Sequence, residues 1–409
     1  VGVGGPHEPY RQSERSAIYQ EHAQILLDAG KAYYAFDTSE ELDAMRATFE
    51  SQGSAFQYNA VTRTRLKNSL TLSDEEVKAK IEAGEPYVIR LKVPAKEEIR
   101  FKDLIRDWVH VHSSTIDDKV LMKSDGLPTY HLANVVDDHL MNITHVIRGE
   151  EWLPSAPLHV MLYRYLGWEE VMPQFAHLPL LLKPEGNGKL SKRDGDRLGF
   201  PVFPLQWTDP KTQEVSSGYR EGGYYPEAVA NMLALLGWHP SGNQELFSME
   251  ELIAEFSLER VSKSGAKFDV QKALWFNQQY LQRKPLHEQY ELLKPQVEAK
   301  GYDASQEYVE QVIALMREKV QFAKEVVEEG YYFFEVPTSY DEEVIRKKWK
   351  AETGSHMVGL ADAFAALADN AVAEDFETAF KSYCEIAGVK TGELLQPLRV
   401  AVSGAPMGP

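Results

Sequence analysis

Two lysines and a serine lie close together in this chain and could bind phosphate. Lys189, Ser191 and Lys192 fall in the sequence KLSKR, which follows the loop LLKPEGNG with its two glycines. Ammonium groups on such a loop suit a polyphosphate, because they neutralise charge that develops on its oxygens. An ordinary basic surface loop has the same composition, so KLSKR alone leaves both interpretations open.

A second group of side chains could bind a carboxylate. Arg148 directly follows a short β-branched strand predicted over 144–147, where its guanidinium can meet a carboxylate with two hydrogen bonds. Tyr130 and Asn134 lie one turn apart on one face of a helix predicted over 130–141. The structural alternative is a salt bridge from Arg148 to Asp137, Asp138 or Glu150.

The elements around these residues follow the order of an α/β unit. Asp125-Gly126 predicts a tight turn before the helix 130–141. After the strand 144–147, a further helix begins near Pro154, and an apolar run at 178–182 leads into the lysine-bearing loop. The stretch 125–196 is therefore predicted to be half of a nucleotide-binding fold. His145 and His177 flank its strands and are expected to be structural.

Composition excludes several classes of protein. The 409 residues are enough for about two to four domains. No apolar run approaches a membrane span, and the first residues lack the order of a signal peptide, so a cytoplasmic protein without a membrane segment is expected. The single Cys384 excludes a disulfide framework and a Cys-rich zinc site in this chain.

The net charge of −18 opposes binding of a polyanion at long range. A nucleic acid would have to meet local basic patches, which could equally be solvated helix faces. The candidates are Arg63 with Arg65 and Lys67, Arg260 with Lys263 and Lys267, and Arg346 with Lys347, Lys348 and Lys350.

Several separated segments resemble one family. PTYHLANVVDD, ITHVIRGEEWL, HLPLLL and KLSKR occur in the order found in bacterial glutamyl-tRNA synthetases, and KLSKR is similar to the KMSKS-type signature of class I aminoacyl-tRNA synthetases. The resemblance runs from GGPHEPYRQSER to LLQPLRVAVSG. It implies an α/β, Rossmann-like class I catalytic domain with an α+β insertion, followed by an all-α anticodon-binding domain.

The resemblance also implies an activity and roles for particular residues. The activity is ATP-dependent ligation of L-glutamate to tRNA(Glu) through a glutamyl-adenylate, with Mg²⁺ bound to ATP, no zinc, and a monomeric enzyme. Arg148, Tyr130 and Asn134 would bind glutamate. Lys189 and Lys192 would neutralise the leaving pyrophosphate. The ATP site would comprise Leu180, Leu181, Lys189, Ser191 and Lys192, with Glu151 and Trp152 near the nucleotide or the tRNA 3′ end.

The domains expected from the resemblance are four. They are 1–36 with 125–196 for catalysis, 37–124 for the acceptor-arm insertion, 197–284 for a stem-contact fold and 285–409 for the helical anticodon-binding domain. The family's HIGH-type motif is expected to lie before residue 1, and its helical domain to extend further. The role of the polar loop 198–223 is left open.

Helix boundaries come from local signals. Capping boxes are predicted at Thr38 with Glu41, Ser73 with Glu76 and Ser248 with Glu251. A helix over 13–29 is predicted to bury Ile18, His22, Ile25, Leu26 and Ala29.

Three other functions remain open. A glutaminyl-tRNA synthetase shares the catalytic fold but would be expected to have a β-barrel anticodon region. A glutamyl-queuosine synthetase resembles only the catalytic part. A non-catalytic tRNA-binding protein would retain these motifs without the reaction.

Overall fold

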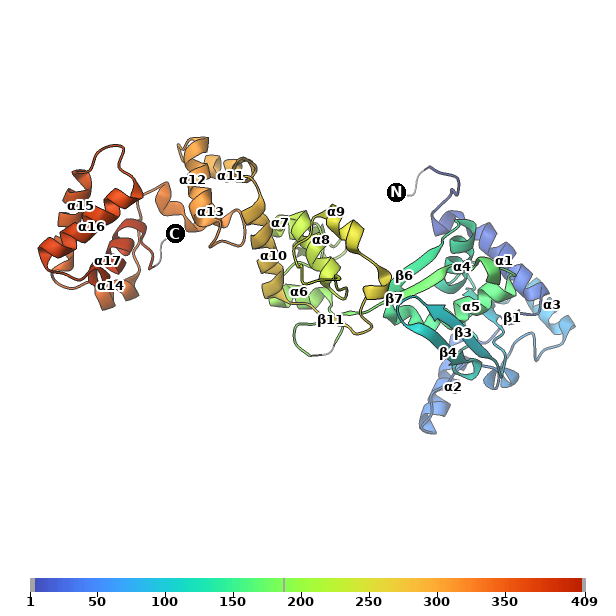
Figure 1. Ribbon diagram of the computed structural model, residues 1–409. Helices are drawn as coiled ribbons and strands as arrows, with labels where there is room; N and C mark the ends of the chain where they lie inside the picture. Colours follow the sequence, from blue (N-terminus) through green and yellow to red (C-terminus); the bar gives the residue numbers. More distant parts are fainter. Residues whose placement is uncertain (1–3, 187, 407–409) are drawn as a thin grey trace. The chain divides into compact units, whose positions relative to one another are not determined.

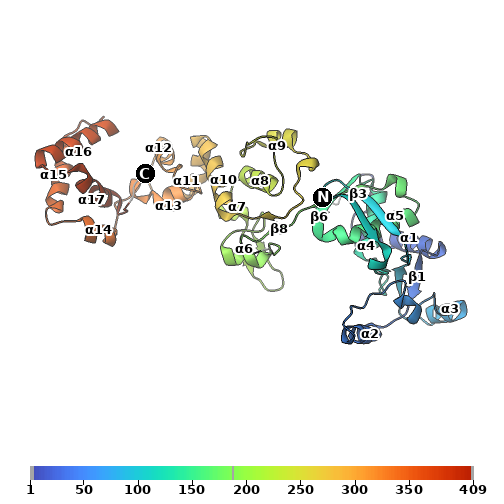
Figure 2. The same ribbon diagram turned by 60° about the horizontal axis from the view of Figure 1, so that its bottom comes forward.

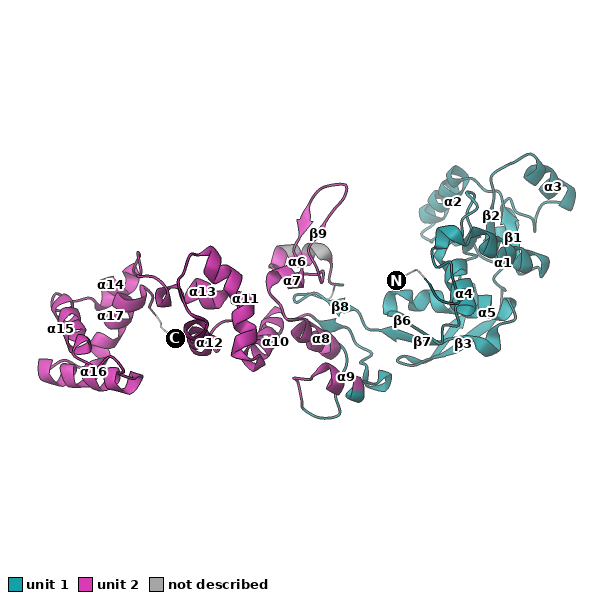
Figure 3. Ribbon diagram, turned by 90° about the horizontal axis from the view of Figure 1, so that it is seen from above, with its two compact units in different colours: residues 1–189, 236–243, 254–267 teal, residues 190–235, 244–253, 268–409 magenta. Residues whose placement is uncertain are grey.

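The computed structural model describes residues 4–186 and 188–406, and for Lys192, Arg193 and Asp196 only the backbone. These residues form two compact units (Figure 3). The first comprises 1–189, 236–243 and 254–267, and the second comprises 190–235, 244–253 and 268–409.

The first unit contains a four-stranded sheet in the order β4-β3-β7-β6. Strands β3 (Glu98–Asp103) and β4 (Asp107–His112) are antiparallel, whereas β7 (Gln174–Leu178) runs parallel to both β3 and β6 (His145–Gly149). The parallel pairs bring the carboxyl ends of β3, β7 and β6 to one edge, where the site described below lies.

A smaller antiparallel sheet, β1-β2-β5, takes two of its strands, β2 and β5, from the predicted insertion 37–124. It contains β1 (Ala32–Ala35), β2 (Val88–Leu91) and β5 (Val120–Met122). Helices α2 (Ser39–Ser51) and α3 (Asp74–Glu82) belong to the same segment, and each begins with its predicted capping box, from Thr38 and Ser73. These two predictions are confirmed.

Three helices enclose the core of the first unit. They are α1 (Ser16–Asp28), α4 (Tyr130–Leu140) and α5 (Ala156–Tyr165), and α5 contacts β3 (Figures 1 and 2). Residues 156–163 of α5 are all buried, because the helix lies in the middle of the core.

The predicted stripe of α1 is partly wrong. Tyr19 and Ala23 are fully buried, whereas Ile25 is 43% exposed. Tyr19 takes the core position because its hydroxyl reaches Asp137 of α4, at 2.7 Å from Oδ2, while its ring packs in the core. The buried residues of α1 are Tyr19, His22, Ala23 and Leu26, so His22 and Leu26 follow the prediction, whereas Ala29 is exposed like Ile25.

The chain leaves the large sheet through Pro179 and forms β8 (Leu181–Leu182). This strand pairs in parallel with β11 (Ala266–Lys267), and Leu182 also bridges to Lys189 in antiparallel fashion. This bridge holds the first lysine of KLSKR beside β8.

The second unit is almost entirely helical. It holds α6 (Lys192–Leu198), α7 (Tyr219–Gly222), α8 (Pro226–Leu235), α10 (Val270–Arg283) and the helices from α11 (Leu286–Ala299) onward, which are α12 (Gln306–Met316), α13 (Glu325–Glu329), α14 (Glu342–Lys348), α15 (Thr353–Ala365), α16 (Ala373–Ala387) and α17 (Thr391–Ser403). Helix α9 (Met249–Glu255) starts in this unit with the predicted Ser248–Glu251 box. The loop 198–223 contains a small hairpin of β9 (Trp207–Thr208) and β10 (Val215–Ser216).

The predicted domain limits stay predictions. One pairing bears on how such limits are drawn: β3 lies in the predicted insertion 37–124, yet it pairs with β7 of the predicted catalytic segment, Asp103 opposite Phe175. The insertion and the catalytic segment therefore share one sheet within the first unit.

Candidate active site

Arg148 is the penultimate residue of β6 and lies at the carboxyl edge of the large sheet. Its Nε donates to Nε2 of His177 at 3.1 Å, and its Nη1 donates to the hydroxyl of Tyr130 at 3.1 Å. Nη1 also lies 3.4 Å from Nδ1 of His159. Nη2 is buried and has no hydrogen-bond partner among the described residues. Three neutral acceptors thus hold the guanidinium and leave one terminal nitrogen open.

The imidazoles of His159 and His131, near Arg148, are uncharged at neutral pH. Burial, followed by the charge of Arg148, lowers the pKa of His159 well below its ordinary value. Burial likewise lowers the pKa of His131 to about 4. The two rings are joined by a hydrogen bond of 3.1 Å between His131 Nδ1 and His159 Nε2, which also requires one of these nitrogens to be unprotonated. At neutral pH the positive charge in this region therefore belongs to Arg148.

The described residues do not form the alternative salt bridge from Arg148 to Asp137, Asp138 or Glu150. Asp137 accepts from Arg15 at 2.8 Å and from Tyr19, and Glu150 accepts from Arg106 at 2.6 Å. Within the described ranges no carboxylate lies in ion-pair distance of Arg148.

Asp138 is the remaining carboxyl of the alternative, and it is half-buried. It accepts a hydrogen bond from the amide of Asn134 at 2.9 Å. Burial raises its pKa to about 6, although the charge of Arg148 acts in the opposite direction. Among the predicted glutamate ligands, Tyr130 therefore contacts Arg148 directly, whereas Asn134 is bonded to Asp138.

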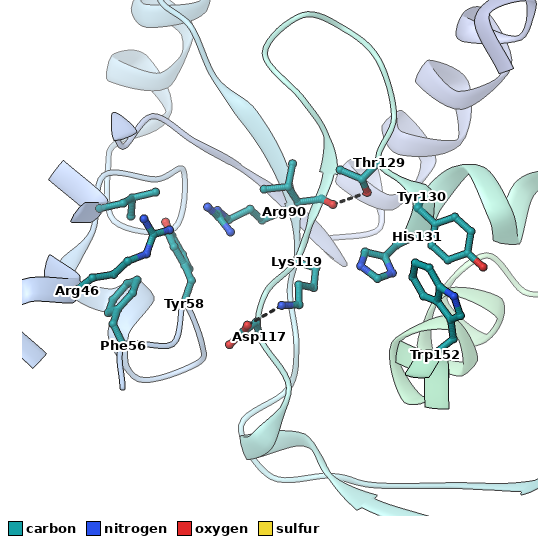
Figure 4. A pocket seen from close by; sticks show the side chains of 12 residues that line it. Arg46, Phe56, Tyr58, Arg90, Asp117, Lys119, Thr129, Tyr130, His131 and Trp152 are labelled. Atoms are coloured by element: carbon teal, nitrogen blue, oxygen red, sulfur yellow. Dashed lines mark hydrogen bonds and ion pairs between the residues drawn. The ribbon is translucent and has the colours of Figure 1, made fainter. Parts of the chain in front are cut away.

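A pocket of about 530 Å³ opens beside Tyr130 (Figure 4). The ring of Tyr130 lies 4.4 Å from that of Trp152, measured between centroids. Across the pocket are Phe56 and Tyr58, and the guanidinium of Arg90 covers the Tyr58 ring at 3.9 Å. Arg46 and Lys119 add two further cations to a lining that is otherwise rich in aromatic rings.

Lys189 is ion-paired. Its Nζ lies 2.5 Å from Oε1 of Glu151. The hydrogen bond from Lys189 lowers the pKa of Glu151, which is therefore ionised at neutral pH. Lys189, predicted for the ATP site, thus contacts Glu151, predicted for the nucleotide or the tRNA 3′ end, within the first unit.

Two residues predicted for the ATP site lie in the segment that leads to Lys189, Leu180 just before β8 and Leu181 within it. The backbone N–H of Leu180 donates to Glu150 at 3.1 Å, and the carbonyl of Leu180 accepts from Ala266 at 3.0 Å. Leu181 begins β8, opposite Ala266 of β11. The backbone of this segment is therefore fixed on both sides.

Ser191 and Lys192 lie in the second unit, which begins at Leu190. The carboxylate of Asp194 accepts from the backbone N–H of Ser191 at 2.9 Å and from its hydroxyl, so Ser191 acts as the N-terminal cap of α6. Lys192 is the first residue of α6, and its side chain lies outside the described part of the structure.

Comparison with known proteins identifies the family. Residues 2–275 match the model of the class I tRNA synthetases (E and Q), catalytic domain, and residues 288–409 match the anticodon binding domain. The glutamate–tRNA ligase of Cytophaga hutchinsonii is 56% identical over 412 residues, covering 100% of this chain and 79% of that protein. That of Bacteroides fragilis is 55% identical over 410 residues, covering 100% and 80%. The chain belongs to the glutamate–tRNA ligases.

A solved structure agrees with this assignment. The crystal structure of a glutamate tRNA ligase from Elizabethkingia meningosepticum in complex with its amino acid superimposes with a TM-score of 0.92 at 49% identity, covering 99% of this chain and 80% of that one. This glutamate–tRNA ligase attaches glutamate to tRNA at the expense of ATP, and the predicted fold class and enzyme class are confirmed. The likeness extends through the helical C-terminal region and does not favour the alternative functions.

The basic patches of this ligase differ in accessibility. Arg63 is only 12% exposed, because its Nη1 donates to the fully buried Asp118 at 3.0 Å, so it does not belong to a solvent-facing patch. Arg260 pairs with Glu255 at 3.4 Å. Arg346 and Lys348, by contrast, are exposed in the last turn of α14.

The described residues contain neither a membrane-spanning helix nor a cluster of metal-binding side chains. No helix in 4–186 or 188–406 is long and apolar enough to cross a membrane. Across the same residues, no three His, Cys, Asp or Glu side chains are grouped so that they could hold a metal ion.

Sequence reasoning missed the surroundings of Arg148. It assigned His177 a structural role and did not single out His159, His131 or Asp103. The apolar run at 178–182 gave no signal for this neighbour, because the strand that pairs with β6 is β7 (Gln174–Leu178), in which His177 lies opposite Arg148.

Proposed function

We propose that Arg148 binds the side-chain carboxylate of glutamate, with Tyr130 and Asn134 completing the pocket. The observation that carries this proposal is the state of the guanidinium: neutral acceptors hold it, no described carboxylate pairs with it, and its Nη2 is buried without a partner. A buried N–H group of a cation without an acceptor is costly, so the site favours a ligand that supplies one.

The same arrangement favours glutamate over glutamine. Glutamine presents a neutral amide, and its binding would leave the buried positive charge of Arg148 uncompensated. Sites that pair a charge with the ligand reject the uncharged analogue far more strongly than an apolar pocket rejects an extra methylene.

The ATP side of the reaction is assigned to the segment after β7. The backbone at Leu180 and Leu181 would lie against adenine, and Lys189, Ser191 and Lys192 would contact the phosphates of Mg²⁺-bound ATP. The α-carboxylate of glutamate attacks the α-phosphate and pyrophosphate leaves. A hydroxyl of the terminal ribose of tRNA then attacks the acyl carbon of the adenylate, and AMP leaves. The substrates supply both nucleophiles, so the protein contributes position and charge stabilisation.

The pocket beside Tyr130 suits the single-stranded end of tRNA. Aromatic rings stack on bases, and cations follow the phosphate backbone. Trp152, Tyr58 and Arg90 supply these groups. We therefore assign Trp152 and Glu151 to the tRNA 3′ end or the nucleotide. The enzyme is proposed to act as a cytoplasmic monomer.

Pyrophosphate exchange in the presence of tRNA(Glu) tests this assignment. Arg148→Ala should reduce glutamate-dependent exchange by at least about a hundredfold, since hydrogen bonds to charged groups contribute about 1.5–3 kcal/mol each. Arg100→Ala, an exposed arginine on β3 paired with Glu98, is the matched control and should retain exchange. Unchanged exchange in Arg148→Ala refutes the pocket.

A further inference from the structure

A buried carboxylate and an imidazole stand directly behind Arg148. Asp103, the last residue of β3, and His177, on β7, are both 0–1% exposed. Nδ1 of His177 lies 2.6 Å from Oδ2 of Asp103, and Nε2 of the same ring accepts from Arg148 Nε at 3.1 Å. The three side chains follow one another across the adjacent strands β3, β7 and β6.

Asp103 fixes the tautomer of His177. Burial raises the pKa of Asp103, but hydrogen bonds from His177 and from the backbone N–H groups of Arg106 and Ile105 outweigh it, so the pKa is lowered and the carboxylate is ionised. An ionised carboxylate accepts only, so His177 must carry its proton on Nδ1. Its Nε2 lone pair is then directed at Arg148.

An imidazole in this position orients Arg148 without consuming its charge. A carboxylate in direct contact would neutralise the guanidinium and compete with a carboxylate ligand. The ring of His177 separates Asp103 from Arg148. The carboxylates of Asp137 and Glu150 are paired with Arg15 and Arg106. His159, the other ring on Arg148, is neutral as well. The guanidinium is thus held in place while its charge remains available.

We propose that His177 and Asp103 are positioning residues that set the orientation of Arg148 for the glutamate side-chain carboxylate. The proposal rests on the function proposed for Arg148. Neither residue touches the substrate. Their effect should therefore appear in glutamate affinity and in discrimination against glutamine, and not in the affinity for ATP.

Two substitutions separate the two hydrogen bonds of His177. His177→Gln places its side-chain oxygen near the position of Nε2 and can still accept from Arg148. It loses the bond to Asp103, but an amide oxygen accepts without a carboxylate to set its tautomer, so the role of Asp103 is no longer needed. His177→Asn places its amide near the position of Nδ1 and can still donate to Asp103, but it leaves Arg148 Nε without an acceptor. Both remove the ring, so a merely structural role would affect the two alike.

Calorimetric titration of L-glutamate and exchange kinetics provide the readout. We expect His177→Gln to bind glutamate within about threefold of the wild type and His177→Asn at least about tenfold more weakly, with the preference for glutamate over glutamine reduced in parallel. The KM for ATP should stay within about twofold in both. The same changes at His145, exposed on β6, are the control and should have no effect.

The outcomes distinguish this proposal from the one on which it rests. If Arg148→Ala weakens glutamate binding but the Gln and Asn variants lose affinity equally, only the positioning proposal is overturned. If Arg148→Ala leaves glutamate binding unchanged, the proposed function fails as well. Should the variants not fold, nitrogen chemical shifts of His177 in the wild type decide: protonated Nδ1 with unprotonated Nε2 supports the proposal, and the opposite tautomer overturns it.

Discussion

Lys189 and Glu151 form an ion pair, with Nζ 2.5 Å from Oε1, and the two side chains are 58% and 38% exposed. Such exposed pairs contribute less than about 1 kcal/mol, so a phosphate can replace the carboxylate as the partner of Lys189. We predict that Glu151→Gln leaves the KM for ATP unchanged or lower, because it frees the lysine. Lys189→Ala should lower kcat/KM for ATP by about tenfold or more.

Steady-state exchange with varied ATP checks this prediction. Glu97→Gln, which removes a carboxylate paired with Arg164 at 3.4 Å, serves as the control. A KM for ATP that rises as much in Glu151→Gln as in Lys189→Ala would show that Glu151 itself contributes to ATP binding in the way assigned to the lysine.

Lys192 is predicted to act on the leaving pyrophosphate. Lys192→Ala should slow adenylate formation by about 100-fold or more, with glutamate affinity little changed, because its contact strengthens only as charge develops. Single-turnover measurement of adenylate formation, together with glutamate titration, separates the two quantities. A loss confined to glutamate affinity would contradict the role.

Asp138 makes stability depend on pH. Its folded-state pKa of about 6 lies above the unfolded value of about 4, so the folded protein binds this proton more tightly. The resulting stability is full below about pH 4 and is lost as the pH rises to about 6. Since the carboxyl is partly exposed, solvent screening limits the change between pH 5 and 7 to about 1 kcal/mol or less.

We therefore predict that Asp138→Asn removes this part of the pH dependence. Urea unfolding at pH 5 and pH 7 should show a smaller loss of stability over that interval in the variant than in the wild type. Asp43→Asn, at an exposed position paired with Arg46, should leave the loss of stability between pH 5 and pH 7 unchanged. If Asp138→Asn lost as much stability between pH 5 and pH 7 as the wild type, this carboxyl would not be the source of the pH dependence.

The exposed cations of α14 are predicted to contact tRNA. Arg346 and Lys348 lie in the part of the chain that matches the anticodon binding domain. Replacing both by alanine should weaken tRNA(Glu) binding and reduce the slope of log K against log salt by about 1 to 2, as phosphate contacts are lost. Lys381→Ala, at a lysine paired with Glu377 one turn away, should change the slope less. An unaltered slope in the double variant excludes these residues from the interface.

Local chemistry was readable from the sequence. The capping boxes at Thr38, Ser73 and Ser248 depend on residues three apart, and all three are present. Tyr130 and Arg148 could be paired because a helix followed by a strand brings the start of one to the end of the other, and their side chains do bond.

Long-range relationships were not readable. In the sequence Arg63 belongs to a candidate basic patch. In the structure its side chain bonds to Asp118, 55 residues later, and is largely buried. Asp103 and His177 are 74 residues apart, and nothing in their neighbourhoods indicates that β3 and β7 pair in parallel. The acceptors that hold Arg148 therefore required the structure.

Titration of L-glutamate and L-glutamine into the wild-type enzyme and Arg148→Ala, followed by calorimetry, tests the central claim most directly. We predict that the wild type binds glutamate far more tightly than glutamine and that Arg148→Ala loses this preference along with most of its glutamate affinity, while its thermal unfolding is unchanged. A variant that still prefers glutamate by the wild-type ratio would contradict the account, because the charge that selects the substrate would then lie elsewhere.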